Sequence, residues 1–355
     1  MSGSVSADFG LLSTLIANSA TVRQRFDTLT GQASSGLISN TYAGLGGTAP
    51  VALALSPQVK SLQAYQAGID AVSGPAQVTQ TAMTRMQKIG ADLVANLNNL
   101  NGLSPSEIDS IAANARSSLA EVGGLLNSKY GDAYVFAGQD SANPPVPDPD
   151  RIAQSGFFTQ IAAAVGDLSA TTAATTLGIA GSNAAGTSPF SAYLSQPSAG
   201  LTPPTARTGD GTAEPIGLVA SANTTAISAG GTTTGSYMRD LMRALATVGS
   251  LTSGQASDPN FAALVSDTRT SLDGAITAMS TDVGVLGQQQ SSLQTQKTRM
   301  ADTATALTGQ ISNAENVDMA ATLSSLTQTQ TQLQASYQLI STANSMSLVK
   351  YLPGG

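Results

Sequence analysis

The sequence predicts a mainly α protein, in which both chain ends contribute long antiparallel helices to one helical rod or coiled-coil bundle. Two observations carry this prediction: rows of apolar residues with a period of 3.5 lie near each terminus, and the middle of the chain has a different composition. A third is that only 10% of the 355 residues are charged and 4% are aromatic. Small uncharged residues let helices approach closely and leave nearly neutral faces, which suits a surface that other copies of the chain will cover.

The C-terminal stretch from Asp318 to Leu352 carries the clearest pattern. Its apolar residues recur in steps of three, four and seven, with Gln330 at the polar position: Met319, Leu323, Leu326, Leu333, Tyr337 and Ile340. Met346 and Leu348 follow them. Such a row predicts a helix that lies along other helices.

The N-terminal stretch shows the same arithmetic. A helix is expected from about Val5 to Ser35, ending at Gly36. Its row consists of Leu12, Leu15, Val22, Phe26, Leu29 and Ala33, interrupted by Ser19. Two rows of equal period most simply pair with each other, so we expect both chain ends to close one rod. The residues of both rows are candidate assembly contacts.

Long helices are also expected inside the chain. Apolar residues alternate in steps of three and four from Leu62 to Leu100, and Gly74-Pro75 should kink this helix. Ser104-Pro105-Ser106-Glu107 is a capping box with proline at the first helical position, so a third helix starts there and runs to about Tyr130. Further helices are expected over 236–248 and, after Asp258-Pro259, along a row that ends near Ile311.

The segment between these helices is rich in Gly, Thr, Ser and Pro. It opens with four prolines over 144–149, and a short helix is expected around 151–166. Thr208-Gly209-Asp210-Gly211 before Pro215 predicts a turn and a strand. The sequence therefore divides into half of a helical rod over 1–138, an inserted loop-rich or β-rich domain over 139–235, and the second half of the rod over 236–355. Because the apolar rows lie outside the insert, we expect the rod to fold without it.

The composition argues against enzymatic, metal-binding and nucleic-acid-binding functions. The chain has no Cys, His or Trp, which removes the common zinc and copper ligands and the usual general base. We expect no enzyme activity and no cofactor. A net charge of −7 with 15 Lys and Arg lacks the basic footprint of a nucleic-acid partner. No apolar run approaches the ~18 residues of a membrane span, and the N-terminus is not a convincing signal peptide. Secretion would need another route.

Three stretches resemble the flagellin superfamily. The run from Asn127 to Gly138, with Tyr134-Val135-Phe136-Ala137-Gly138 at its end, is followed by Pro144-Pro145 and looks most like the hook–filament junction proteins of that superfamily. Gln332-Leu333-Gln334-Ala335-Ser336-Tyr337, with Met346-Ser347-Leu348 after it, is similar to their C-terminal end. Ser34-Ser35-Gly36 is similar to the family's Ser-Ser-Gly turn, although the basic residue and paired Asp that usually follow are absent.

The resemblance implies a secreted, non-enzymatic part of the bacterial flagellum. Such a subunit would pass through the flagellar type III export channel, with an export chaperone, and form a homo-oligomeric ring between the hook and the filament. Its partners would be other hook-associated proteins and flagellin, with no membrane or nucleic acid. Two alternatives stay open: flagellin itself, the filament subunit, and, in a different class, a secreted coiled-coil effector or translocator.

Overall fold

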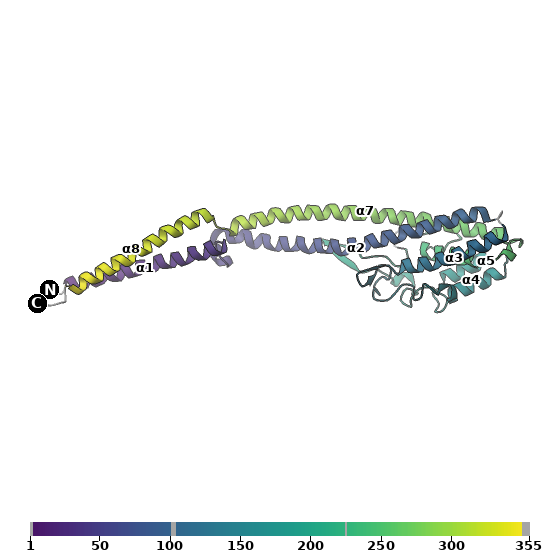
Figure 1. The fold of residues 1–355 in the computed structure, drawn as a ribbon, viewed down its shortest axis with the longest axis horizontal. Helices are drawn as coiled ribbons and strands as arrows, with labels where there is room; N and C mark the ends of the chain where they lie inside the picture. Colours follow the sequence, from purple (N-terminus) through teal and green to yellow (C-terminus); the bar gives the residue numbers. More distant parts are fainter. Residues whose placement is uncertain (1–2, 101–103, 224–225, 350–355) are drawn as a thin grey trace. The chain divides into compact units, whose positions relative to one another are not determined.

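The computed structural model describes the backbone of residues 3–100, 104–223 and 226–349, and side chains over 13–100, 104, 106–223 and 226–344. It confirms the predicted fold class. Long helices come from both ends of the chain, and short strands occur in the middle segment (Figure 1). The chain forms two compact units, one made of Met1–Leu62 and Asp302–Gly355 and the other of Gln63–Ala301.

The first unit is built on two terminal helices. Helix α1 (Gly3–Ser35) and helix α8 (Met319–Val349) run side by side in opposite directions (Figure 1). Gly36 ends α1 with φ of 73°, a conformation that glycine adopts without steric cost. The predicted stop at Gly36 is thus confirmed.

Within this unit, backbone hydrogen bonds join the segment after α1 to the segment before α8. The Ile38 N–H donates to the Glu315 carbonyl at 2.7 Å, and the Val317 N–H donates to the Gly36 carbonyl at 3.0 Å. The Thr48 hydroxyl, at the end of a 3₁₀ segment (Tyr42–Thr48), donates to the Ala314 carbonyl at 2.8 Å. The Ser-Ser-Gly turn is therefore held by the residues that precede α8.

The second unit contains a single large hydrophobic core among the described residues. Helices α2 (Ala49–Asn99) and α7 (Phe261–Glu315) contribute their 63–99 and 261–301 portions to it, together with α3 (Pro105–Leu126) and α6 (Tyr237–Gly249). At the start of α3, the Ser104 N–H donates to the Glu107 carboxylate at 2.8 Å, which confirms the predicted capping box. Hydrogen bonds from the Ser104 hydroxyl and the Ser104 N–H lower the pKa of the Glu107 carboxyl group.

Helix α2 continues through Gly74-Pro75, the position of the predicted kink. Gly74 leaves room for the Tyr130 ring, because a Cβ there would lie 2.3 Å from the ring carbon Cζ. Tyr130 belongs to strand β1 (Lys129–Tyr130), which pairs with β2 (Ala133–Tyr134) in an antiparallel hairpin. The third helix ends before this hairpin rather than at Tyr130.

The middle segment combines two short helices and a second hairpin. Helix α4 (Gly156–Gly166) lies within the helix predicted around 151–166, and Asp210-Gly211 forms the predicted turn. That turn joins the antiparallel strands β3 (Thr205–Gly209) and β4 (Thr212–Pro215), whereas the predicted strand began only at Pro215. Helix α5 (Thr172–Gly181) and the 3₁₀ turns Ile152–Gln154, Ser198–Gly200 and Ser253–Gln255 were not predicted. Threonine-rich α5 lacks a strong helical pattern in sequence.

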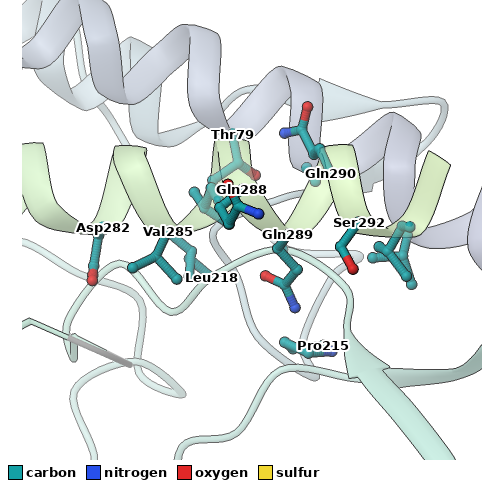
Figure 2. A pocket seen from close by; sticks show the side chains of 14 residues that line it. Thr79, Pro215, Leu218, Asp282, Val285, Gln288, Gln289, Gln290 and Ser292 are labelled. Carbon is teal, nitrogen blue, oxygen red and sulfur yellow. The ribbon is translucent and has the colours of Figure 1, made fainter. Parts of the chain in front are cut away.

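Helix α6 lies at the centre of the second unit and is buried along its whole length. It packs against α3, α4 and α5. Its Tyr237 hydroxyl donates to Asp282 of α7 (labelled in Figure 2) at 2.9 Å, and burial raises the pKa of that phenol. Asp240 accepts hydrogen bonds from the Ser228 hydroxyl and, at 2.8 Å, from the Thr234 N–H. These polar contacts fasten the loop before α6 to the helix.

The middle segment shares its core with the long helices. Phe157, Ile161 and Phe190 belong to the same buried cluster as Met83 of α2 and Leu272 of α7. This shared core argues against the expectation that the helices fold without residues 139–235. The predicted domain boundaries at 138/139 and 235/236 stay predictions.

Candidate assembly surface

The face that α1 turns toward α8 matches the predicted N-terminal row. Ser19 is buried, and five apolar residues are half-buried at steps of three, four and seven: Leu15, Val22, Phe26, Leu29 and Ala33. The described residues between them, apart from Gln32, are exposed. Because the helices pack against each other, this periodic burial defines the contact face of α1.

The contact face of α8 lies slightly to one side of the predicted row. Its members follow alternating steps of four and three: Thr322, Leu326, Thr329, Leu333, Ser336, Ile340 and Ala343. Thr322 and Thr329 are only 7% and 3% exposed. The Thr329 hydroxyl donates to the Ser325 carbonyl at 2.7 Å, so this polar group is buried with a hydrogen bond.

A second row on α8 carries exposed apolar residues, which we name the exposed row. It consists of Leu323, Gln330 and Tyr337, seven residues apart, and Leu323 and Tyr337 are each 49% exposed. Met319, Leu339 and, on α1, Ile16 are further large apolar residues that face solvent. Helix α8 contains no charged residue. A neutral surface of this kind can be covered without desolvating charge, and clustered exposed apolar side chains mark interaction sites.

The two-helix arrangement explains why the α1–α8 pair has spare apolar surface. Two helices can bury only their facing sides, and none of the core clusters of described residues includes a residue of α1 or α8. Helical stability in proteins comes mainly from packing of an apolar face. Additional partners would therefore stabilise this pair.

The structure separates the predicted assembly residues into three groups. Leu15, Val22, Phe26, Leu29, Leu326, Leu333 and Ile340 lie in the α1–α8 contact face, and Leu323 and Tyr337 lie in the exposed row. The side chains of Leu12, Met346 and Leu348 lie outside the described residues. A role for any of them in assembly stays a prediction.

Sequence reasoning missed Thr322, Thr329 and Ser336 as contact residues. A row chosen by hydrophobicity prefers Leu323 and Tyr337 to these hydroxyl-bearing neighbours. A usable signal was present: the three residues are spaced by seven, and each lies four residues before Leu326, Leu333 or Ile340.

The described residues lack the features of two other kinds of site. They contain no cluster of three or more His, Cys, Asp or Glu placed to hold a metal ion. Among them, every helix is too short or too polar to cross a membrane.

Comparison with known families assigns a class to the C-terminal helices. Residues 270–352, which cover most of α7 and all of α8, match the family described as the bacterial flagellin C-terminal helical region. The match is confined to this C-terminal part of the chain, and it supports a relationship of that part to the flagellin superfamily. No curated protein matches the chain.

Proposed function

We propose that this protein is the junction subunit between the flagellar hook and the filament, and that it assembles through its terminal helices. The observation that carries the proposal is the exposed row beside the α1–α8 contact face, within the region that matches flagellin. Leu323 and Tyr337 offer apolar area on a helix without charge. A non-enzymatic, structural role follows from this proposal.

Burial of the exposed row would stabilise an assembly through many small contributions. Removing apolar surface from water contributes roughly 25 cal/mol per Å². A half-exposed leucine or tyrosine therefore contributes on the order of 1 kcal/mol when a neighbouring subunit covers it. Each subunit in a closed ring repeats the contact, so the total grows with the number of copies.

The resemblance around residues 127–138 favours the junction role over other flagellar roles. In the structure, Phe136 of this run is fully buried, and the Ala220 N–H donates to its carbonyl at 2.9 Å. The run thus serves the core of the second unit. The run carries the family resemblance, and the proposal assigns it no contact with the hook.

The second candidate is flagellin, the filament subunit. The description of the matching family favours it, because that family is named for the flagellin C-terminal region. Both candidates use the same terminal helices and the same exposed row. They differ in copy number, because the junction would be a ring of subunits and the filament a long polymer. A secreted coiled-coil effector or translocator is the alternative of another class.

The proposed partners follow from the junction role. The subunit would contact hook-associated proteins on one side and flagellin on the other, after export through the flagellar type III channel with a chaperone. The proposed function involves neither a nucleic acid nor a membrane.

Immunogold electron microscopy on intact flagella tests the proposal. An antibody raised against the second unit should label one band where the hook meets the filament. Deletion of the gene should leave hooks without filaments and release filament subunits into the medium. Labelling along the whole filament would instead identify a filament subunit, and absence of label from flagella would contradict both flagellar roles.

A further inference from the structure

A cavity of about 330 Å³ lies beside the start of α6 in the second unit. The end of α5 and the loop after it, the 3₁₀ turn Ser198–Gly200 and the loop before α6 surround it, and Asn183, Ser221, Asn223, Ser236 and Arg239 contribute to its wall. A volume of this size falls at the lower end of the range for small-molecule sites, which is roughly 300–1,000 Å³. The residues that line the cavity all belong to the second unit, whereas the terminal helices belong to the first.

Arg239 places a buried positive charge in the cavity wall. It is 6% exposed, and burial lowers the pKa of its guanidinium. Its N–H groups donate to neutral acceptors: the carbonyls of Ala180, Ser182 and Ser221, at 2.9, 3.1 and 3.1 Å, and the Asn183 side-chain oxygen at 2.8 Å. Among the described residues, no carboxylate lies within ion-pair distance of this guanidinium.

The nearest carboxylate that acts on Arg239 is that of Asp240, the next residue of α6. Its two oxygens accept hydrogen bonds from Ser228 and Thr234, and the same carboxylate also attracts Arg243. The Arg239 guanidinium also lies over the Phe190 ring, with its Cζ 5.2 Å from the ring centroid. Neutral acceptors and an aromatic ring thus surround this charge, and an anion in the cavity would balance it.

Two hydroxyl groups of the wall lack hydrogen-bond partners. Ser221 and Ser236 are each 5% exposed, and the Oγ of each makes no hydrogen bond in the described part of the protein. A buried polar atom without a partner costs free energy and calls for an explanation such as a ligand. A serine has three staggered side-chain rotamers, so either hydroxyl can be re-aimed toward a bound molecule.

We propose that this cavity binds a small hydroxylated carboxylic acid of the size of a sugar acid. Arg239 would balance the carboxylate, and Ser221, Ser236 and the Asn223 amide would pair with its hydroxyl groups. The single guanidinium of Arg239 matches one negative charge rather than the two of a phosphate. The cavity wall combines polar side chains with Ala222 and Ile227, which suits hydroxyl groups carried on a carbon skeleton.

Isothermal titration of the full-length protein tests this proposal, with glucuronate as the probe. Glucose serves as the neutral analogue, and acetate as the carboxylate without hydroxyl groups. We expect glucuronate to bind at least about tenfold more tightly than either analogue, because only glucuronate uses both the charge and the hydroxyl partners. Lack of glucuronate binding, or equal binding of glucose, would overturn the proposal.

Serine variants separate ligand binding from stability. Ser236→Ala and Ser221→Ala should leave the melting temperature unchanged or slightly higher, because each removes a hydroxyl that lacks a partner, yet weaken glucuronate binding by about fivefold to tenfold. Ser271→Ala is the matched control. Ser271 is also buried with an Oγ that lacks a partner, but it lies in α7 and away from the cavity wall, so binding should not change.

A rim variant tests the location without touching the buried residues. Ser198 is exposed and contributes to the cavity wall, so Ser198→Trp should obstruct the mouth and abolish glucuronate binding while the protein stays folded. Unchanged binding in both Ser198→Trp and Ser236→Ala would show that glucuronate binds elsewhere and would overturn the assignment.

Discussion

Thr322 and Leu323 are adjacent in α8 and lie in opposite environments, since the threonine is 7% exposed and the leucine is 49% exposed. The polar residue is buried near the contact with α1, and the apolar residue faces solvent. The same inversion recurs two heptads later, where Ser336 is half-buried and Tyr337 is exposed. Helix α8 thus has one face that contacts α1 and a second, apolar face that the proposed assembly would cover.

The first prediction concerns the face toward α1. Leu333→Ala should destabilise the α1–α8 pair by about 1–2 kcal/mol, less than for a fully buried leucine because this side chain is half-buried. Amide hydrogen exchange in the isolated chain should show faster exchange in α8. Gln334→Ala is the control, because Gln334 is exposed. Equal exchange in the two variants would contradict a contact between Leu333 and α1.

The second prediction concerns the contact between two distant segments of the second unit. Gly217 has φ of 76°, and a Cβ there would lie 2.2 Å from the Val135 carbonyl oxygen. Gly217→Ala should therefore cost more than about 1–2 kcal/mol in chemical denaturation. Gly284→Ala in α7 meets no atom within 4 Å, so it should stabilise the protein by up to ~1 kcal/mol. Similar midpoints for both variants would refute the close approach at Gly217.

The third prediction concerns the shared core. Phe157→Ala removes a ring that is 1% exposed and should destabilise the second unit by about 3–5 kcal/mol. Replacement of residues 139–235 by a short linker should likewise abolish the cooperative melt of that unit. A deletion variant with a full, cooperative melt would show that the long helices do not depend on this segment.

The fourth prediction concerns pH. Burial raises the pKa of Asp240 and of Asp267. Each group then binds a proton more readily in the folded than in the unfolded state, so the free energy of unfolding falls as pH rises through the folded-state pKa values. Between pH 7 and about 4, near the pKa of an unfolded aspartate, acidification should therefore increase the contribution of these groups to stability.

An asparagine substitution isolates this effect. Asp267→Asn should flatten the pH dependence of the denaturation midpoint over that window. Ser266→Ala, which removes no titratable group from an exposed position of the same helix, should leave it unchanged. The effect of Asp267 is reduced by its attraction to Arg243, 3.8 Å away. An unaltered slope in Asp267→Asn would contradict a raised pKa at this residue.

The long helices were predictable from the sequence because their signals are local. The spacing of apolar residues gave α1, α2, α7 and α8, and the capping box gave the start of α3. Helix α5 escaped prediction because its threonines and glycines lack a helical pattern, and tertiary contacts with α6 support it. The shared core was not predictable, because it brings residues far apart in the chain, such as Phe136 and Leu272, into one buried cluster.

The candidate site was only partly predictable for a similar reason. Hydrophobicity identified Leu326, Leu333 and Ile340 correctly as residues that face another helix. It could not distinguish Thr329 from Gln330 as the polar member of the contact face. That choice depends on a local hydrogen bond, from the Thr329 hydroxyl to the Ser325 carbonyl, which makes burial of the threonine inexpensive.

The most direct test of the assembly surface is Leu323→Asp in the exposed row, measured in the native bacterium and in the purified chain. Because Leu323 is 49% exposed, the isolated variant should keep the melting curve of the wild type. Assembly should fail, because a subunit contact would bury an unpaired carboxylate, and cells should export the protein without retaining it on flagella. Leu323→Met, which preserves an apolar side chain, should assemble and support swimming. Normal flagella and swimming in Leu323→Asp cells would contradict the claim that this row is a contact between subunits.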